Sequence, residues 1–309
     1  MTRFVIYRLV SIIPVLIGIS IMVFFMVRLV PGDPIDIMYA NRAKPSPAQR
    51  TVIEHQMGLD LPIYAQYGRY MRGILLHGDL GTSFRTKQPV TSQIRTRLPN
   101  TIKLTIGSLA IALVIGISAG VLSATFRNTW IDRVCMLIAV AGVSIPAFWL
   151  GLMLILLFSV HLGWLPVAGA RSWRYLVLPS LTLGLVVSAV LARITRASML
   201  EALNQDYVRT ARAKGLREVV VVYRHALRNA LIPVVTIVGL LIGSLLSGAF
   251  IIEAVFGFPG LGLLAVNALQ TRDFPLIQGI VLLVATIYVI VNVLVDILYG
   301  LIDPRIKFS

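Results

Sequence analysis

Residues able to do acid–base, nucleophilic or metal chemistry are few and scattered in this sequence. The four histidines, His55, His77, His161 and His225, lack the spacing of a metal site, and the single cysteine, Cys135, lies in an apolar run. The sequence has neither a His-Glu-x-x-His pattern nor a Gly-x-x-x-x-Gly-Lys-Ser/Thr loop for a triphosphate. We therefore expect no catalytic residue, no metal site and no cofactor held by this chain.

Polar and small side chains recur at three- and four-residue spacing in two apolar segments, 231–252 and 277–302. Such a stripe can line a path for a solute, or it can let neighbouring helices pack and hydrogen-bond. Both interpretations stay open for segment 231–252. For segment 277–302 we favour packing, because Asp296 lies toward the cytoplasmic end of the segment. The candidates for a translocation path are Thr236, Gly243, Ser244, Ser247, Asn292 and Asp296.

The composition indicates a membrane protein. Hydrophobic residues make up 57% of the chain and charged residues 13%, and the mean hydropathy is +0.86. A hydrocarbon layer of about 30 Å needs about 20 apolar residues per helix. Runs of that kind lie near 9–27, 104–126, 134–160, 176–191, 231–252 and 277–302. We expect an all-α polytopic protein with six transmembrane helices, the first retained and the third kinked at Pro146.

The distribution of positive charge indicates how the chain is oriented. The chain has 28 Lys and Arg against 13 Asp and Glu, and basic residues follow or precede the apolar runs near 3–8, 127–133, 193–228 and 305–307. Short cytoplasmic loops carry such an excess, so it places both termini in the cytoplasm. Because orientation accounts for the net charge of +15, no nucleic-acid partner is needed.

The pattern divides the chain into three parts. Residues 1–30 form the first transmembrane helix, 31–100 an extracytoplasmic insertion, and 101–309 a five-helix core with a cytoplasmic loop at 193–230. The insertion is too long for a simple connection, and long segments are translocated largely regardless of charge. We expect it to form a small cap of short helices. Its Gln66, Tyr67 and Tyr70 offer a contact surface, or the cap shields the bundle.

The cytoplasmic loop contains a short amphipathic helix. Asp206 can cap a helix from 207 to 214, and Gly215 suits the left-handed residue that ends it. Tyr207, Val208 and Ala211 share one face, and the remainder is basic. From the residues alone, such a rod can dock into a groove of another protein, or it can lie on anionic headgroups.

The loop also resembles a known sequence. Residues 206–216, Asp-Tyr-Val-Arg-Thr-Ala-Arg-Ala-Lys-Gly-Leu, followed by 225–233, resemble the coupling loop of bacterial ABC importer permeases of the dipeptide, oligopeptide and nickel branch. The likeness spans the chain. It includes the segments 29–34, 77–81, 163–166, 259–262 and 303–306.

This resemblance implies a permease of the type I ABC importer fold in the bacterial inner membrane. It implies dipeptides or short oligopeptides as cargo, with a nickel complex or glutathione as the alternative. The implied partners are a second homologous permease, two ATP-binding subunits that bind ATP and magnesium, an extracytoplasmic substrate-binding protein and membrane lipid. Glu253 and the turn 256–262 are further candidates for contact with the binding protein. A remoter alternative is a lipid-interacting membrane enzyme or scaffold.

The residues expected to couple the chain to the ATPase come from the same resemblance. When the loop is aligned on Gly215, Arg209 stands where the family usually has Glu. A cation cannot make the contacts of a carboxylate, so the pairing with the ATPase must differ in detail. The expected coupling residues are Glu201, Asp206, Tyr207, Arg209, Thr210, Ala211, Arg212, Lys214, Gly215 and Leu216.

Overall fold

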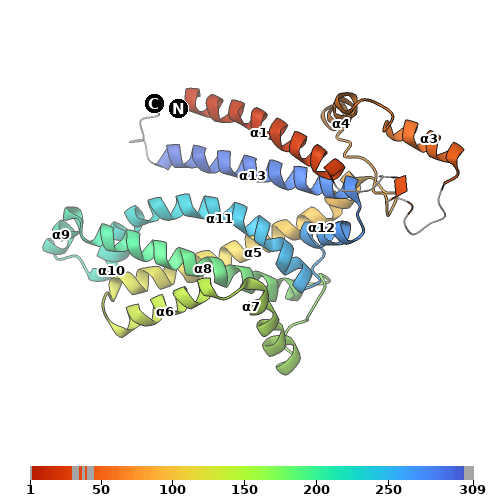
Figure 1. Cartoon of the computed structure of the whole chain (residues 1–309). Coiled ribbons are helices and arrows are strands. Elements are labelled where there is room, and N and C mark those ends of the chain that lie inside the picture. Colours follow the sequence, from red (N-terminus) through yellow and green to blue (C-terminus); the bar gives the residue numbers. More distant parts are fainter. Residues whose placement is uncertain (1, 30–34, 37–38, 40–44, 303–309) are drawn as a thin grey trace.

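The computed structural model describes residues 2–29, 35–36, 39 and 45–302, and this part of the chain is almost entirely helical. Long helices run side by side, and short ones lie at the two ends (Figure 1). The helices are α1 (Thr2–Leu29), α3 (Pro47–Met57), α4 (Ile63–His77), α5 (Val90–Thr125), α6 (Trp130–Ser144), α7 (Ala147–Leu154), α8 (Arg174–Leu203), α9 (Asp206–Ala213), α10 (Glu218–Val220), α11 (Leu227–Val255), α12 (Leu261–Gln270) and α13 (Phe274–Ile302). Two π-helical segments, Ile155–His161 and Val221–Ala226, follow α7 and α10.

Four helices of the described residues are long and apolar enough to cross a membrane. They lie in α5, α8, α11 with the residues before it, and α13. The pair formed by α6 and α7 with its π-helical end would be a fifth span, and the apolar stretch Val10–Met26 of α1 is shorter. The polytopic all-α class is confirmed, whereas the expected count of six helices is not.

The third expected span, 134–160, is not a single kinked helix. The chain bends by 105° between Trp130–Ser144 and Ala147–His161. Pro146 has no N–H to donate, and its ring keeps the preceding residue out of the helical region, so Ile145 is extended with φ −82° and ψ 125°. Proline therefore breaks this segment into two helices.

Small residues hold α5 against α8. A Cβ added to Gly116 would lie 2.6 Å from the Cβ of Leu191, and one added to Gly120 would lie 2.5 Å from the Cβ of Thr195. Only glycine allows the two helices to approach this closely. Gly116 and Gly120 therefore serve packing, as their four-residue spacing suggests.

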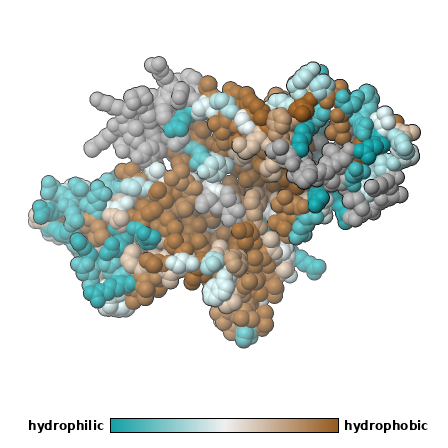
Figure 2. All heavy atoms as spheres, viewed as in Figure 1, coloured by the Kyte–Doolittle hydropathy of each residue, from teal (hydrophilic) through white to brown (hydrophobic). Residues whose placement is uncertain are grey.

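The apolar core joins α5, α8 and α11. Leu104, Leu178, Leu191, Ile252 and Phe256 are nearly inaccessible to solvent and belong to one cluster. Figure 2 shows hydrophobic residues over the middle of the molecule and hydrophilic residues gathered at its two ends. This distribution is typical of a bundle whose middle lies in lipid.

Two buried carboxylates fix the end of the bundle that carries α12. Glu253 accepts hydrogen bonds from Thr101 Oγ1 (2.6 Å) and from the backbone N–H groups of Gly262 (2.6 Å) and Leu263 (3.1 Å), so it caps the start of α12. Asp273 accepts hydrogen bonds from the Ser83 hydroxyl and from the N–H of Phe84 (3.0 Å). The hydrogen bonds of Asp273 tie the end of the insertion to the turn before α13.

The first and last helices lie together. α1 packs along α13, and the start of α1 and the end of α13 lie at the end of the molecule that also carries α9 (Figure 1). The insertion, with α3 and α4, lies at the opposite end. The arrangement thus separates two polar ends by the apolar middle.

Candidate functional site

The short helix α9, between α8 and α10, is the best-defined candidate site. It spans Asp206–Ala213, close to the expected 207–214. Asp206 is not its capping residue: the N-cap is Gln205, which makes no side-chain cap hydrogen bond, and Asp206 lies in the first turn. Gly215 has φ +75° and takes the left-handed conformation expected of it. The sequence therefore located the helix and its end but misplaced its cap by one residue.

The apolar side of α9 faces its own bundle. Val208 and Ala211 are 0% and 5% exposed and pack in one cluster with Met199, Val221 and Ala226. Val208 and Ala211 are thus covered by the chain's own bundle, whereas Tyr207, which was expected to share their face, stays partly exposed. The side chains of Val208 and Ala211 anchor α9 to α8 and to the π-helical segment Val221–Ala226.

The side of α9 that faces away from the bundle is polar. Arg209, Thr210 and Lys214 are exposed, and Tyr207 is 39% exposed. Glu201, at the end of α8, and Leu216, after α9, are also exposed. Any partner that meets α9 in this conformation meets hydroxyl and cationic groups beside one aromatic ring.

An ion pair links α9 to α10. The guanidinium of Arg212 donates to the two carboxylate oxygens of Glu218 from Nε (3.1 Å) and Nη2 (2.6 Å). The hydrogen bond to the Glu218 carboxylate raises the pKa of Arg212 above its usual value. Arg212 is therefore occupied within its own subunit. Arg209 makes only a longer, exposed ion pair with Asp206 (3.8 Å), so Arg209 and Lys214 still present cationic groups to the outside.

A second ion pair lies close to this end of the bundle and was missed in the sequence. Asp132, 4% exposed, accepts two hydrogen bonds from Arg196 and one from the N–H of Asn128. Ser123 also donates to it, so the pair joins α5, α6 and α8. The signal was an acid just before one apolar run and a base just after another, but 64 residues separate them.

The structure brings together only some of the residues that we expected to line a translocation path. Gly243 on α11 is buried against the ring of Tyr288 on α13, and both line a cavity of about 660 Å³ between α1, α11, α12 and α13. The cavity lining is apolar: it includes Ile19, Leu246 and Phe250. Thr236 donates to the carbonyl of Ile232 (3.3 Å) on its own helix. Thr236 and Asn292 do not line this cavity, and the side chains of Ser244, Ser247 and Asp296 lie outside the described residues.

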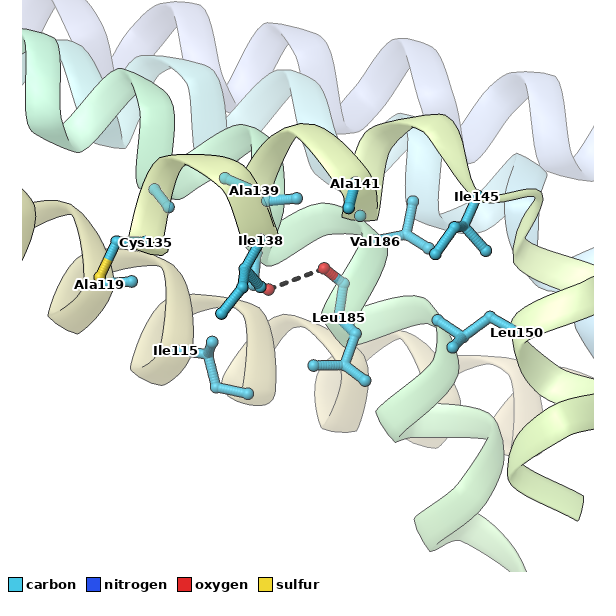
Figure 3. A pocket seen from close by; sticks show the side chains of 14 residues that line it. Ile115, Ala119, Cys135, Ile138, Ala139, Ala141, Ile145, Leu150, Leu185 and Val186 are labelled. Atoms are coloured by element: carbon cyan, nitrogen blue, oxygen red, sulfur yellow. Dashed lines mark hydrogen bonds between the residues drawn. The ribbon is translucent and has the colours of Figure 1, made fainter. Parts of the chain in front are cut away.

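A smaller cavity, of about 270 Å³, lies between α5, α6, α7 and α8 (Figure 3). Its walls are aliphatic, with Ile115, Ile138 and Leu185 pointing toward it and Cys135 at one end. The hydroxyl of Ser188 is engaged by the carbonyl of Leu185 at 2.7 Å. The cavity therefore offers no converging polar groups for a solute.

The side chains that we expected to contact an extracytoplasmic partner point toward the chain's own helices. Gln66 accepts a hydrogen bond from Arg28, and the hydroxyls of Tyr67 and Ser20 are 2.8 Å apart, so the inner side of α4 lies against α1. Tyr70 lies near Phe24 of α1. Glu253 is fully buried as the cap of α12. In this conformation these groups hold the cap and α12 in place.

The sequence matches two family models that together account for nearly the whole chain. Residues 112–308 match the binding-protein-dependent transport system inner membrane component, and residues 1–105 match the N-terminal part of such membrane components. The chain belongs to this family. It is an inner-membrane permease subunit of a bacterial ABC importer, a transport subunit rather than an enzyme, and it works with ATPase and membrane partners.

Relatives match over the full length of both chains. The chain is 46% identical over 309 residues to the glutathione transport system permease protein GsiC of Escherichia coli K12, and 47% identical to that of Pectobacterium atrosepticum. The fold is similar to that of the MetNI methionine ABC transporter in an inward-facing form, with a TM-score of 0.57 and 21% identity over 69% of this chain and 97% of that one. The crystal structure of an amino acid ABC transporter with histidines matches with a TM-score of 0.53 and 20% identity, over 70% of this chain and 95% of that one.

Proposed function

We propose that this permease moves short peptides, with the tripeptide glutathione as its best candidate cargo, and that ATP hydrolysis by partner subunits drives it through α9. A second homologous permease, two ATP-binding subunits that bind ATP and magnesium, and an extracytoplasmic substrate-binding protein would complete the transporter. This chain itself would hold no cofactor.

The full-length relatives support the choice of cargo. Proteins 46–47% identical over all 309 residues bear the name glutathione transport system permease. Dipeptides and longer oligopeptides share the peptide backbone of glutathione and remain compatible with the same path. A nickel complex is the alternative.

The observation that carries the coupling proposal is the orientation of α9. Val208 and Ala211 fix the helix to the transmembrane bundle, while Arg209, Thr210 and Lys214 stay exposed. A helix that is packed against the bundle on one side and exposed on the other can transmit the movement of a bound partner to α8 and α11. With Arg209 at the position usually occupied by Glu, we propose that the facing surface of the ATPase is acidic.

We place α9 and both termini on the cytoplasmic side and the insertion on the extracytoplasmic side. The basic residues near 3–8, 127–133 and 193–228 support this orientation. It is also consistent with the position of the start of α1 and the end of α13 at the α9 end.

Uptake by the assembled transporter tests the cargo. Proteoliposomes that contain this permease, its partner subunits and the binding protein should take up labelled glutathione in the presence of ATP. Unlabelled glutathione and short peptides should compete. Transport of a nickel complex with no peptide uptake or competition would contradict the proposal.

Charge reversal on α9 tests the coupling. Arg209→Glu should lower ATP hydrolysis and copurification of the ATPase by about tenfold or more, because a like charge would face the acidic surface. The matched control is Arg171→Glu, an exposed arginine in the segment before α8, at the opposite end of that helix. Equal loss in both variants, or no loss in Arg209→Glu, would contradict a docking role for this face.

A further inference from the structure

A polar cavity of about 240 Å³ lies where the insertion meets α1 and α13. Arg28 comes from the end of α1, Arg69 and Tyr70 from α4, Asp79 from the turn after α4, and Gln278 from α13. The cavity is smaller than the roughly 300–1,000 Å³ usual for pockets that enclose a whole small-molecule ligand. It suits a single small polar group.

The cavity has hydrogen-bond donors to spare. Arg28 donates to the carbonyl of Phe24 (3.2 Å) and to Gln66, and its guanidinium stacks 3.5 Å from the centre of the Phe24 ring. A guanidinium has five N–H groups, so three of those of Arg28 have no partner among the described residues. Arg69 makes no hydrogen bond or ion pair with any described residue and acts on Asp60 only through its charge. Within the described residues, neither arginine is paired with a carboxylate.

Tyr70 adds a neutral donor. Its hydroxyl is shielded from solvent and has no hydrogen-bond partner among the described residues. Burial raises the pKa of Tyr70 to about 12, so the hydroxyl keeps its proton at neutral pH. A buried hydroxyl without a partner costs free energy, and a bound acceptor would remove that cost.

The position of the cavity indicates the source of the acceptor. Arg28 follows the apolar stretch Val10–Met26 of α1, so it lies at the depth where hydrocarbon gives way to headgroups. α4 is viewed nearly end-on while α1 and α13 run across the picture, so α4 lies transverse to them (Figure 1). Tyr64 and Leu75 on α4 are 80% and 74% exposed beside the basic Arg72. These are features of a helix that lies in the membrane interface.

We propose that this cavity binds the headgroup of a membrane phospholipid, with the phosphate against Arg28, Arg69 and the Tyr70 hydroxyl. Asp79 lines the same cavity, and one of its oxygens accepts from the N–H of Gly81 (2.8 Å). Its charge favours a headgroup with an ammonium, so phosphatidylethanolamine should bind better than phosphatidylglycerol. The bound lipid would hold the insertion on α1 and α13.

Lipid retention by the purified full-length chain in complex with its partners tests the proposal. Native mass spectrometry would follow adducts of added phosphatidylethanolamine and phosphatidylglycerol. Arg28→Gln and Arg69→Gln should each weaken phosphatidylethanolamine binding about ten- to hundredfold, as expected for the loss of a charge-assisted hydrogen bond. Arg72→Gln is the matched control, since Arg72 is an exposed arginine of the same helix that does not line the cavity.

Two further variants keep the test decisive if Arg28→Gln does not assemble. Tyr70→Phe keeps the ring and removes only the hydroxyl, and it should also weaken retention. Asp79→Asn should abolish the preference for phosphatidylethanolamine over phosphatidylglycerol. Equal retention in all variants, or equal loss in Arg72→Gln, would overturn the proposal. So would competition by inorganic phosphate without any lipid adduct, or unchanged lipid retention with weaker association of the binding protein in Arg28→Gln.

Discussion

The guanidinium of Arg196 on α8 donates two parallel hydrogen bonds, of 2.7 and 2.8 Å, to the two carboxylate oxygens of Asp132 on α6. Asp132 also accepts from Ser123 and from the N–H of Asn128, so one carboxylate joins three helices. This end of the bundle also carries α9. The pair therefore ties the α9 end of α8 to α5 and α6.

Removing one member of this pair should destabilise the fold. Arg196→Gln leaves the buried Asp132 charge without its partner, at a cost of about 3–5 kcal/mol. Asp132→Asn leaves the charge of Arg196, whose side chain is 26% exposed, and should cost less. Thermal unfolding of the purified complex should show a clear drop in midpoint. Arg193→Gln, an exposed residue one turn earlier on α8, is the control and should change little. A double variant that costs no more than either single one would confirm the pairing; additive losses would contradict it.

The cap of α12 should be sensitive to Glu253. Glu253→Ala removes the acceptor of the Gly262 and Leu263 N–H groups and of the Thr101 hydroxyl, at about 1–3 kcal/mol for each buried group left unsatisfied. Hydrogen exchange should then accelerate first in the early residues of α12. Glu253→Gln retains an oxygen acceptor and should lose less. If both variants exchange like wild type, the carboxylate is not the cap.

α5 packs so closely on α8 that even one added methyl group should lower the stability of the protein. Gly116→Ala places a Cβ 2.6 Å from that of Leu191, and such overpacking costs about 1–3 kcal/mol. Gly18→Ala is the control, because no atom lies within 4 Å of its added Cβ and alanine favours a helix. Thermal stability measured side by side should fall for the first and stay equal or rise for the second. The reverse order would mean that the two helices are not in this register.

The backbone at Gly215 should tolerate asparagine better than valine. Its φ of +75° lies in the left-handed region, which asparagine enters more readily than β-branched residues. Gly215→Val should therefore disorder the end of α9 and lower stimulated ATP hydrolysis, while Gly215→Asn should retain most of it. Nothing lies within 4 Å of a Cβ added there, so backbone conformation rather than crowding decides the result. Similar activity of the two variants would contradict this reason.

Local signals in the sequence were sufficient for much of the fold. The apolar runs located the long helices, and the pattern around Gly215 located α9, because apolar run length and glycine conformation are local properties. The prediction of one kinked helix over residues 134–160 was wrong. Proline can kink a helix or end it, and the local sequence does not say which.

The side to which α9 turns its apolar residues could not be predicted locally. Periodicity shows that Val208 and Ala211 share a face, but burial depends on which surface lies nearby, and here it is the permease's own core. Because Ala211 is buried, a variant such as Ala211→Arg would disturb the bundle itself. A loss of activity in that variant would therefore not test whether α9 docks to the ATPase. Glu253 shows the same limit: its carboxylate caps a helix that begins eight residues later, a relation that depends on the turn between α11 and α12.

The pairing of α1 with α13 has a consequence for biogenesis. Among the described helices α1 is made before the others, and α13, on which it packs, is made after them. At about 5–20 residues per second, α1 waits on the order of tens of seconds for that surface. During synthesis the insertion machinery or lipid must hold α1, which can pack in its place only when α13 arrives. Truncation within α13 should then release α1 and expose the nascent permease to membrane proteases.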